Sequence, residues 1–288
     1  MSTSEAPGPI APTRTTTIDA PRGALYAEAF VPASPKGVVL ITHGYAEHCG
    51  RYREVAHVIT NAGWAALSYD CRGHGQSPGD RGYIDRFDVY LDDFAAALSA
   101  ARALVAPGAK TVLLGHSHGG LITLRALCDE RPPEVAHAII SSPYLALKKA
   151  VPGWKKLLAR GMSRIAPHFK EKNHIEAVDL THDVAKQKEH DADKLCFDTA
   201  TARWFTESSK AQQFVAERAD RIRVATTWLV GAADPLTDPA QSRHVAGRTP
   251  GADYHDLAGM RHEVFNETER PSVFAHVTRV LGSTLPTG

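Results

Sequence analysis

A glycine-rich turn lies between a strand-like run and a helical run near the middle of the chain. It reads Gly-His-Ser-His-Gly-Gly over residues 115–120, after the apolar run 111–114 and before the helical run 121–127. A serine at the tip of such a turn is exposed, and the glycines around it avoid collisions that side chains would cause. The helix that follows directs its amide N–H groups towards the turn. The pattern predicts that Ser117 is the nucleophile of a serine hydrolase.

Length, composition and charge limit the classes of partner. The chain has 288 residues, of which 43% are hydrophobic and 23% charged, which are ordinary values for a globular domain. A net charge of +1 gives no electrostatic reason to expect a nucleic-acid partner. The chain has no apolar run of about eighteen residues, the length a membrane-spanning helix needs. We expect a cytoplasmic protein that acts on a small molecule and has no obligate protein partner.

Cysteine and histidine usage argues against disulfides and metals. The four cysteines are far apart and show no paired spacing, which favours free thiols in a reducing compartment. The fifteen histidines are scattered, and neither H-x-x-x-H nor C-x-x-C occurs. We therefore expect no metal and no cofactor. The cysteines are Cys49, Cys71, Cys128 and Cys196.

Strand-like and helical segments alternate along most of the chain. This order is typical of an α/β fold in which helices cover both faces of a mostly parallel sheet. Strand-like runs are expected at 24–30, 38–42, 64–69, 111–114, 136–141, 224–230 and 253–257. Helices are expected at 51–61, 89–104, 121–127, 239–246 and 272–281.

Two segments fall outside this alternation. The N-terminal residues are rich in Pro, Ser and Thr and lack the order of a secretory signal, so they predict a mostly disordered tail. A later segment shows no convincing strand, and its basic and acidic residues are segregated, which predicts a helical cap. The expected organisation is a tail at 1–22, a first core part at 23–143, a cap at 144–214 and a second core part at 215–288.

The predicted cap contains one amphipathic helix. Its apolar residues share one face and its basic residues the other. We expect the apolar stripe to form a wall of the substrate pocket, since ligand sites are mostly apolar. The basic face either contacts anionic lipid at a membrane surface or is only solvated. The stripe comprises Trp154, Leu157, Leu158, Met162 and Ile165, and the basic residues are Lys155, Lys156, Arg160 and Arg164.

A serine nucleophile needs a histidine base and a carboxylate that orients it. In folds of this type the acid and then the histidine follow the serine along the chain. Asp234 follows a late strand-like run, and Asp238, four residues on, is the alternative acid or a helix cap. His262 follows the next run and is the expected base, whereas His255 lies within that run and is expected to be structural.

An oxyanion hole needs two backbone N–H donors near the developing negative charge. One is expected from His118, directly after the serine. The other is expected from Tyr45, in the loop after an early strand, where Gly44 allows close approach of the backbone. His116 is expected to pack behind the turn, and the side chain of His118 either binds substrate or is structural.

Several segments resemble the monoacylglycerol lipases and related lysophospholipase-type α/β-hydrolases. Segment 43–52, HGYAEHCGRY, is similar to their HGxGEHxxRY motif, and segment 70–77, DCRGHGQS, to their D-x-R-G-H-G-x-S turn. The turn around Ser117 and segments 231–238 and 259–263 match in order, over about residues 24–282. The resemblance implies an eight-stranded α/β-hydrolase fold with a helical cap, hydrolysis of lipid-type carboxylic esters, and Asp234 as the catalytic acid.

Three positions depart from the family pattern. His118 stands where methionine is usual, Ala46 where glycine is usual, and the donor position carries the bulky Tyr45. These changes put the preferred substrate in doubt but leave the reaction type intact. Glu47, His48, Arg51 and Arg72 form either a polar substrate site or, as we favour, a buried salt-bridge network that supports the oxyanion loop.

Other functions remain open from the sequence. Within enzymes they are a lysophospholipase, a peptidase or a perhydrolase of the same fold. Outside enzymes the alternative is a hydrolase-fold receptor that keeps the pocket without turnover. The retained serine, aspartate and histidine favour a serine ester hydrolase that cleaves monoacylglycerol-like or short- to medium-chain acyl esters through an acyl-enzyme.

Overall fold

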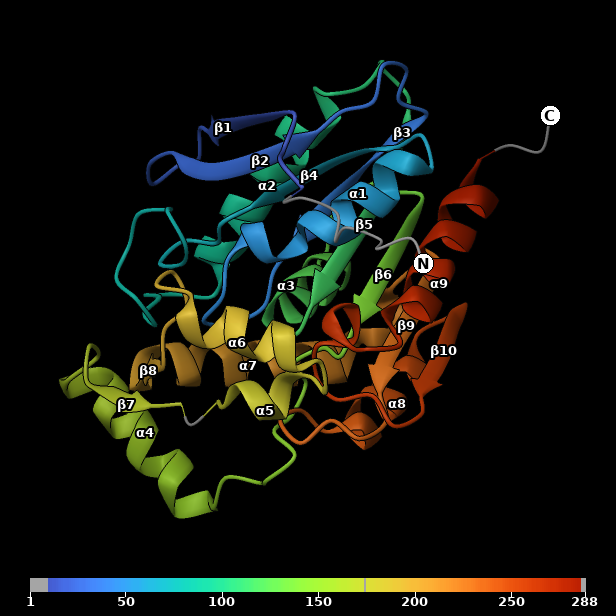
Figure 1. The fold of residues 1–288 in the computed structure, drawn as a ribbon. Helices are drawn as coiled ribbons and strands as arrows, with labels where there is room; N and C mark the ends of the chain where they lie inside the picture. The colour runs from blue at the N-terminus through green and yellow to red at the C-terminus, as the bar shows by residue number, and fades with distance from the viewer. Residues whose placement is uncertain (1–9, 174, 286–288) are drawn as a thin grey trace.

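A sheet of eight strands forms the centre of the computed structural model, which describes residues 10–173 and 175–285 (Figure 1). The first pairs, β1–β2 and β2–β4, are antiparallel, and all other neighbours are parallel. The predicted, mostly parallel α/β-hydrolase sheet is confirmed. In spatial order the strands are β1 (Arg14–Ile18), β2 (Leu25–Phe30), β4 (Ala65–Tyr69), β3 (Gly37–Thr42), β5 (Lys110–His116), β6 (His137–Ser141), β9 (Thr226–Gly231) and β10 (Ala252–Leu257).

Helices cover both faces of the sheet because each presents an apolar stripe to it. The helix α1 (Arg53–Asn61) and the last helix α9 (Arg270–Thr284) bury their valines and isoleucine in one apolar cluster. The second cluster, on the other face, holds buried residues of α2 (Asp88–Arg102), α3 (His118–Leu127) and α8 (Pro239–Arg248). The inner strands β3, β4, β5, β6 and β9 are buried along nearly their whole length, as a sheet covered on both faces requires, whereas the edge strand β10 buries only Leu257.

The prediction of a disordered tail over 1–22 is wrong for residues 14–18. These residues form β1, the antiparallel edge strand beside β2. The strand reads Arg-Thr-Thr-Thr-Ile, and only Ile18 is buried. Threonine favours strands, but a polar edge strand lacks the apolar alternation by which buried strands are detected. The predicted tail at residues 1–9 lies outside the described residues.

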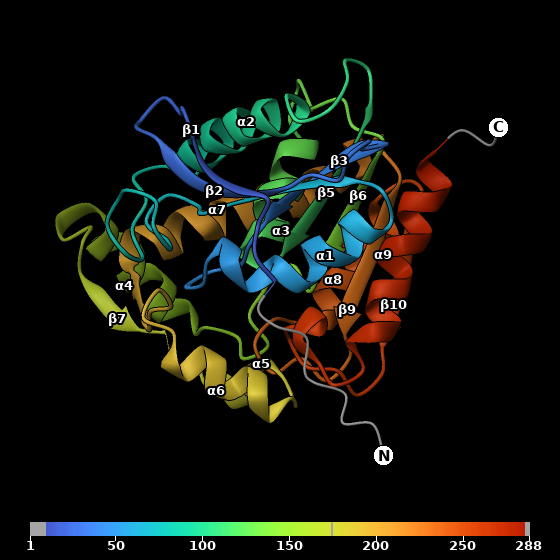
Figure 2. The same cartoon turned by 45° about the horizontal axis from the view of Figure 1, so that its top comes forward.

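In the described residues, the segment between β6 and β9 carries four α-helices, one 3₁₀ helix (Ala219–Arg221) and a small sheet of two strands. Figures 1 and 2 both show α4, α5 and α6 at one end of the central sheet. The sequence predicted no strand here, but β7 and β8 pair antiparallel. Each is three residues long and polar, so no alternating pattern marks it. The elements are α4 (Gly153–Ile165), β7 (Lys170–Lys172), α5 (Ala177–Leu180), α6 (Val184–Ala192), β8 (Thr199–Thr201) and α7 (Ala202–Arg218).

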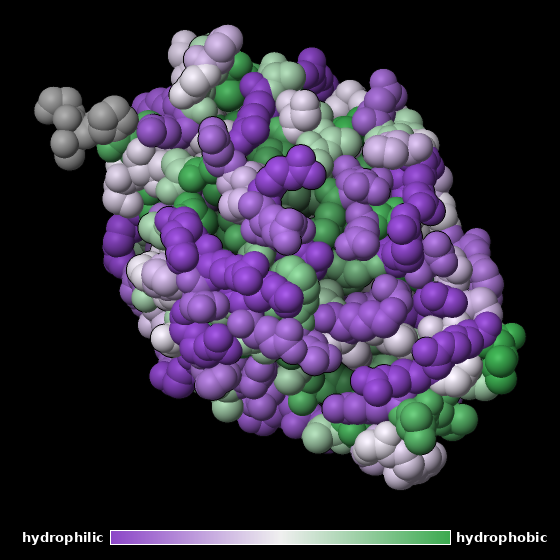
Figure 3. Space-filling view, turned by 180° about the vertical axis from the view of Figure 1, so that it is seen from behind, coloured by the Kyte–Doolittle hydropathy of each residue, from purple (hydrophilic) through white to green (hydrophobic). Residues whose placement is uncertain are grey.

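The apolar stripe of α4 faces solvent. Trp154 is 65% exposed, Leu157 70% and Ile165 81%, whereas the small residue Ser163 is buried. The opposite side of α4 packs against α7, where Lys156 and Arg160 line a groove beside Phe205. Figure 3 shows the resulting apolar patch at the lower right, at the end of the molecule where α4 lies. No helix in the described part of the chain is long and apolar enough to cross a membrane.

Candidate active site

Ser117 lies in the sharp turn between β5 and α3. Its backbone has φ +50°, a left-handed conformation that non-glycine residues rarely adopt. A Cβ on Gly115 would lie 2.6 Å from the carbonyl oxygen of Gly119, and one on Gly119 would collide with the carbonyl groups of the β3 end. The two glycines are therefore required by the close approach of strand, turn and helix, as the sequence predicted.

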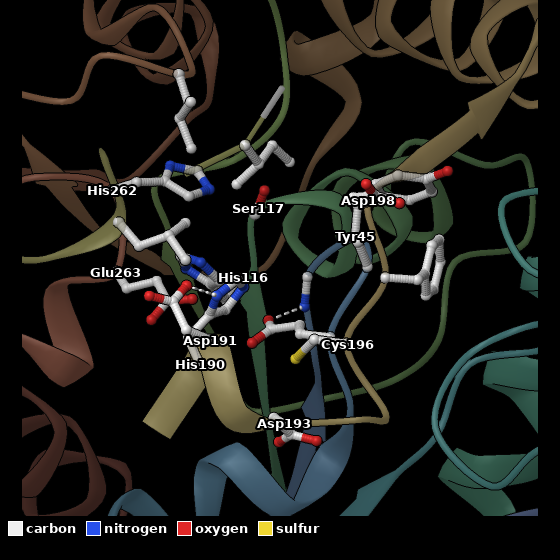
Figure 4. A pocket seen from close by; sticks show the side chains of 17 residues that line it. Tyr45, His116, Ser117, His190, Asp191, Asp193, Cys196, Asp198, His262 and Glu263 are labelled. Carbon is white, nitrogen blue, oxygen red and sulfur yellow. Dashed lines mark hydrogen bonds and ion pairs between the residues drawn. The ribbon is translucent and has the colours of Figure 1, made fainter. Parts of the chain in front are cut away.

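His262 and Asp234 meet at the carboxyl ends of the neighbouring strands β10 and β9. The Nδ1 atom of His262 lies 2.7 Å from Oδ2 of Asp234. The same oxygen accepts the hydroxyl of Thr237 at 2.6 Å, and backbone N–H groups donate to Oδ1, so the carboxylate is held in one orientation. Gly231 permits the contact, because a Cβ there would collide with the backbone of Arg261. Figure 4 shows the His262 ring directed towards Ser117.

The local charges favour a protonated His262 and an ionised Asp234. Burial alone would lower the pKa of His262, but the adjacent Asp234 carboxylate outweighs it and raises this pKa above the ordinary value. Burial would likewise raise the pKa of Asp234, and the charge and hydrogen bond of His262 lower it instead. The pair is thus suited to stabilise an imidazolium that forms when the histidine accepts a proton.

Asp238 has a different role in the structure. Its side chain is the N-cap of α8 and accepts the N–H of Ala240 at 3.1 Å. Of the two aspartates that the sequence left open, the one hydrogen-bonded to His262 is Asp234. His255 lies within β10 and bonds Asp253 at 2.9 Å, away from this pair.

The loop after β3 approaches the serine closely. A Cβ on Gly44 would lie 3.2 Å from the Cβ of Ser117, so only glycine lets the backbone pass here. Tyr45 follows in this loop, and His118 is the first residue of α3, whose N–H has no partner within its helix. The two predicted oxyanion donors therefore lie on the two backbone segments that flank Ser117.

A buried ion network supports this loop. Arg51 Nε lies 3.0 Å from Glu47, and its Nη2 lies 2.6 Å from Glu263, the residue after His262. Glu47 in turn accepts the N–H of Gly44 at 2.5 Å and the hydroxyl of Tyr52 at 2.7 Å. Burial raises the pKa of Glu47. Burial would also raise the pKa of Glu263, but the Arg51 charge outweighs this effect and lowers the pKa of Glu263 to about 2.

The network differs from the predicted one in its members. Arg72 is not part of it, since its guanidinium pairs with Asp93 of α2 at 2.7 Å. His48 bonds through Nε2 to Asp193 at 2.7 Å, which links the core to the segment between β6 and β9. His116 packs behind the turn, with Nδ1 3.0 Å from the hydroxyl of Ser141, and burial lowers its pKa to about 3.

A cavity of about 320 Å³ lies over Ser117 and His262. Its lining includes five carboxylates and no lysine or arginine from the described residues (Figure 4). The carboxylates are Glu47, Asp191, Asp193, Asp198 and Glu263, and the apolar lining is Ile175, Leu180, Phe197 and Leu236.

The prediction that the α4 stripe forms the pocket wall is wrong. None of Trp154, Leu157, Leu158, Met162 and Ile165 lines the cavity. Periodicity shows which residues of a helix share a face, but not what that face contacts. The wall comes instead from residues 190–198, at the end of α6 and in the loop after it. The sequence analysis missed them because a short polar helix end and a loop carry no apolar periodic signal.

One cluster with the donor types of a metal site occurs beside the cavity. Donor atoms of His48, Asp193 and Cys196 all lie within 4.8 Å of one another. The histidine is already hydrogen-bonded at both nitrogens, to Asp193 and to the N–H of Gly50. We therefore regard it as a contact between core and cap. All four cysteines are free thiols, as predicted.

Residues 33–269 match the family described as serine aminopeptidase, S33. The chain belongs to this family. It is 30% identical over 247 residues to the monoacylglycerol lipase of Mycolicibacterium smegmatis, a match that covers 85% of this chain and 87% of the relative. It is 29% identical to phospholipase YtpA of Bacillus subtilis, over 83% of this chain and 93% of the relative.

Solved structures agree with this assignment to the S33 family. The monoacylglycerol lipase of Paleococcus ferrophilus has a TM-score of 0.82 at 27% identity, covering 91% of this chain and 99% of that chain. The monoglyceride lipase of Saccharomyces cerevisiae has a TM-score of 0.83 at 20% identity, and the match covers 98% of this chain and 100% of that chain. This likeness shows the shared fold. The resemblance inferred from the sequence motifs is confirmed, and the protein is a serine ester hydrolase.

Proposed function

We propose that Ser117, His262 and Asp234 form the catalytic triad of this hydrolase. His262 accepts the Ser117 proton, the serine oxygen attacks the ester carbonyl, and Asp234 stabilises the resulting imidazolium. The N–H groups of Tyr45 and His118 hold the tetrahedral oxyanion. His262 then gives its proton to the departing alcohol, and water activated by the same histidine releases the acid. The observation that carries this proposal is the 2.7 Å bond between His262 and Asp234 beside the strained serine. The reaction needs no cofactor.

We further propose that the substrates are neutral carboxylic monoesters, such as monoacylglycerols with short or medium acyl chains. The relatives named as monoacylglycerol lipases support this substrate class. The pocket supports neutral rather than anionic alcohols, because no lysine or arginine from the described residues lines it. Glu47 and Glu263 are paired with Arg51, and the remaining carboxylates of Asp191, Asp193 and Asp198 repel a phosphate group. A lysophospholipase is therefore the less favoured alternative, although the Bacillus subtilis relative is named a phospholipase.

The experiment has two arms. A fluorophosphonate probe should label the protein at Ser117, which a non-catalytic receptor of the same fold would not show. Hydrolysis is then compared on monobutyrin, longer monoacylglycerols, a lysophospholipid and an aminoacyl p-nitroanilide. Labelling at Ser117 with monoacylglycerol as the preferred substrate supports the proposal. Preference for the lysophospholipid or the anilide would contradict it.

The exposed face of α4 supports contact with a lipid surface. Its apolar side chains are flanked by lysines and arginines of the same helix, and all four basic residues are exposed. An amphipathic helix of this composition lies in the interface of an anionic membrane. The contact we propose uses the apolar face first, with Lys155 and Arg164 at its border, whereas Lys156 and Arg160 line the groove towards α7. The four free thiols support a reducing compartment, and we propose the cytoplasm.

A further inference from the structure

The side chain of Tyr45 is fixed between the oxyanion loop and the cap. Its ring lies 3.7 Å from the ring of Trp204, centroid to centroid, and its hydroxyl donates to the carbonyl of Thr199 at 2.7 Å. Edge contacts to Phe197 and His118 hold it from two further sides. A tyrosine packed on four sides and hydrogen-bonded at its tip has one available position.

This ring ends the cavity. Tyr45 lines the space over Ser117, whereas Trp204 does not. Trp204 is buried, and Tyr144 stacks parallel to it at 5.8 Å and 3°. Behind Tyr45, as seen from the cavity, the space is therefore filled by buried aromatic side chains.

The closed side is where the acyl chain must lie. His262 gives its proton to the departing alcohol, so the alcohol lies on the His262 side of Ser117. Figure 4 shows His262 and Tyr45 on opposite sides of Ser117. With the carbonyl oxygen at the N–H groups of Tyr45 and His118 and the alcohol at His262, the acyl carbons take the remaining direction. That direction leads away from His262, to the side on which Figure 4 shows Tyr45.

We propose that Tyr45 sets the acyl-chain length and restricts the enzyme to short acyl groups. This inference rests on the proposed function, because it uses the triad and oxyanion donors given there. The backbone N–H at position 45 contributes to the chemistry, and the side chain selects the substrate. Removing the ring opens space towards Trp204 and His118, into which further methylene groups fit.

The test is a series of p-nitrophenyl esters from acetate to laurate, with kcat/KM measured for wild type, Tyr45→Ala and Tyr45→Phe. Wild type should favour acetate and butyrate. Tyr45→Ala should raise the laurate-to-butyrate ratio of kcat/KM by about 10- to 100-fold, the range that one or a few methylene contacts produce. Tyr45→Phe keeps the ring and should keep the wild-type ratio. A ratio does not depend on the fraction of folded enzyme.

Ile175→Ala is the matched control, because it removes an apolar side chain from the same cavity and leaves the ring contacts and the hydrogen bond of Tyr45 in place. It should change the ratio much less than Tyr45→Ala. A wild type that hydrolyses laurate as well as butyrate, or equal ratios for Tyr45→Ala and Tyr45→Phe, overturns the inference while leaving ester hydrolysis intact. Failure of the wild type to hydrolyse any ester overturns the proposed function itself.

Discussion

His262 and Asp234 are separated by 28 residues in the chain, yet their side chains meet at 2.7 Å. They meet because β9 and β10 are parallel neighbours, so the loops after them leave the sheet at the same edge. Ser117 follows β5 at that edge too, which brings the three groups of the proposed triad together.

Removal of a triad group should abolish turnover without unfolding the protein. Ser117→Ala and His262→Ala should each lower ester hydrolysis by about 10⁴- to 10⁶-fold, and the double variant should be little worse because the groups act as a unit. Asp234→Asn should cost less, and Asp238→Asn very little, since Asp238 caps α8. Steady-state kinetics with circular dichroism checks this. A larger loss for Asp238→Asn would contradict our choice of acid.

The pH dependence of kcat/KM should report the raised pKa of His262. The base must be neutral to accept a proton, so activity falls as pH falls through its pKa. The acidic limb should therefore lie above about 6.5, the ordinary histidine value. In Asp234→Asn the raising charge is lost while burial remains, so the limb should move to lower pH. An unchanged limb in this variant would show that another group controls it.

Charge on the alcohol should alter the rate. At low salt, a neutral butyryl ester of glycerol should be preferred by about tenfold over a glycerol-phosphate ester, and a choline ester should not be penalised. The preference should shrink at high salt because exposed charges are screened. Asp191→Asn, which removes a carboxylate from the rim, should raise relative activity on the anion. Equal activity on both esters at low salt would show that the carboxylates do not face the alcohol.

The Arg51 network should contribute to stability. Arg51→Met leaves two buried carboxylates facing each other and should lower the free energy of unfolding by about 3–5 kcal/mol. Lys172→Met is the control, because its pair with Asp198 is exposed and worth less than about 1 kcal/mol. Urea unfolding measures both. Similar losses in the free energy of unfolding for the two variants would mean that the buried ion network contributes no more to stability than an exposed ion pair.

The exposed face of α4 should matter at a lipid surface only. Leu157→Ser combined with Ile165→Ser should weaken binding to anionic vesicles by about tenfold or more, through loss of apolar burial. Activity on a water-soluble short-chain ester should stay unchanged. Val184→Ser is the control, because Val184 is an exposed apolar residue of α6, 59% exposed, and this variant should bind as wild type. If the double variant binds vesicles as strongly as wild type, α4 is not the surface that contacts lipid.

The sequence predicted the core well because buried strands and tight turns leave local signals. Apolar or alternating runs marked seven of the eight strands of the central sheet, and the glycines around Ser117 marked the turn. Polar β1 left no such signal. The order of acid and histidine along the chain narrowed the candidate acid to two aspartates. The family resemblance favoured Asp234, and in the structure Asp234 bonds His262 whereas Asp238 caps α8.

The cap was harder to predict because its determinants are not local. Helix periodicity grouped the α4 stripe correctly, but which face meets α7 depends on the partner surface. Likewise, nothing near Tyr45 in the chain indicates that its ring stacks on Trp204, more than 150 residues away by the printed sequence.

The backbone N–H and the side chain of residue 45 have separate roles, and this separation has a consequence for engineering. An oxyanion donor that belongs to the main chain is present whichever L-residue other than proline occupies the position. A library of substitutions at position 45 can therefore vary the substrate range while every variant keeps the proposed triad and both oxyanion donors. Position 45 is for that reason a better starting point for redesign than the serine, the histidine or any residue that orients them.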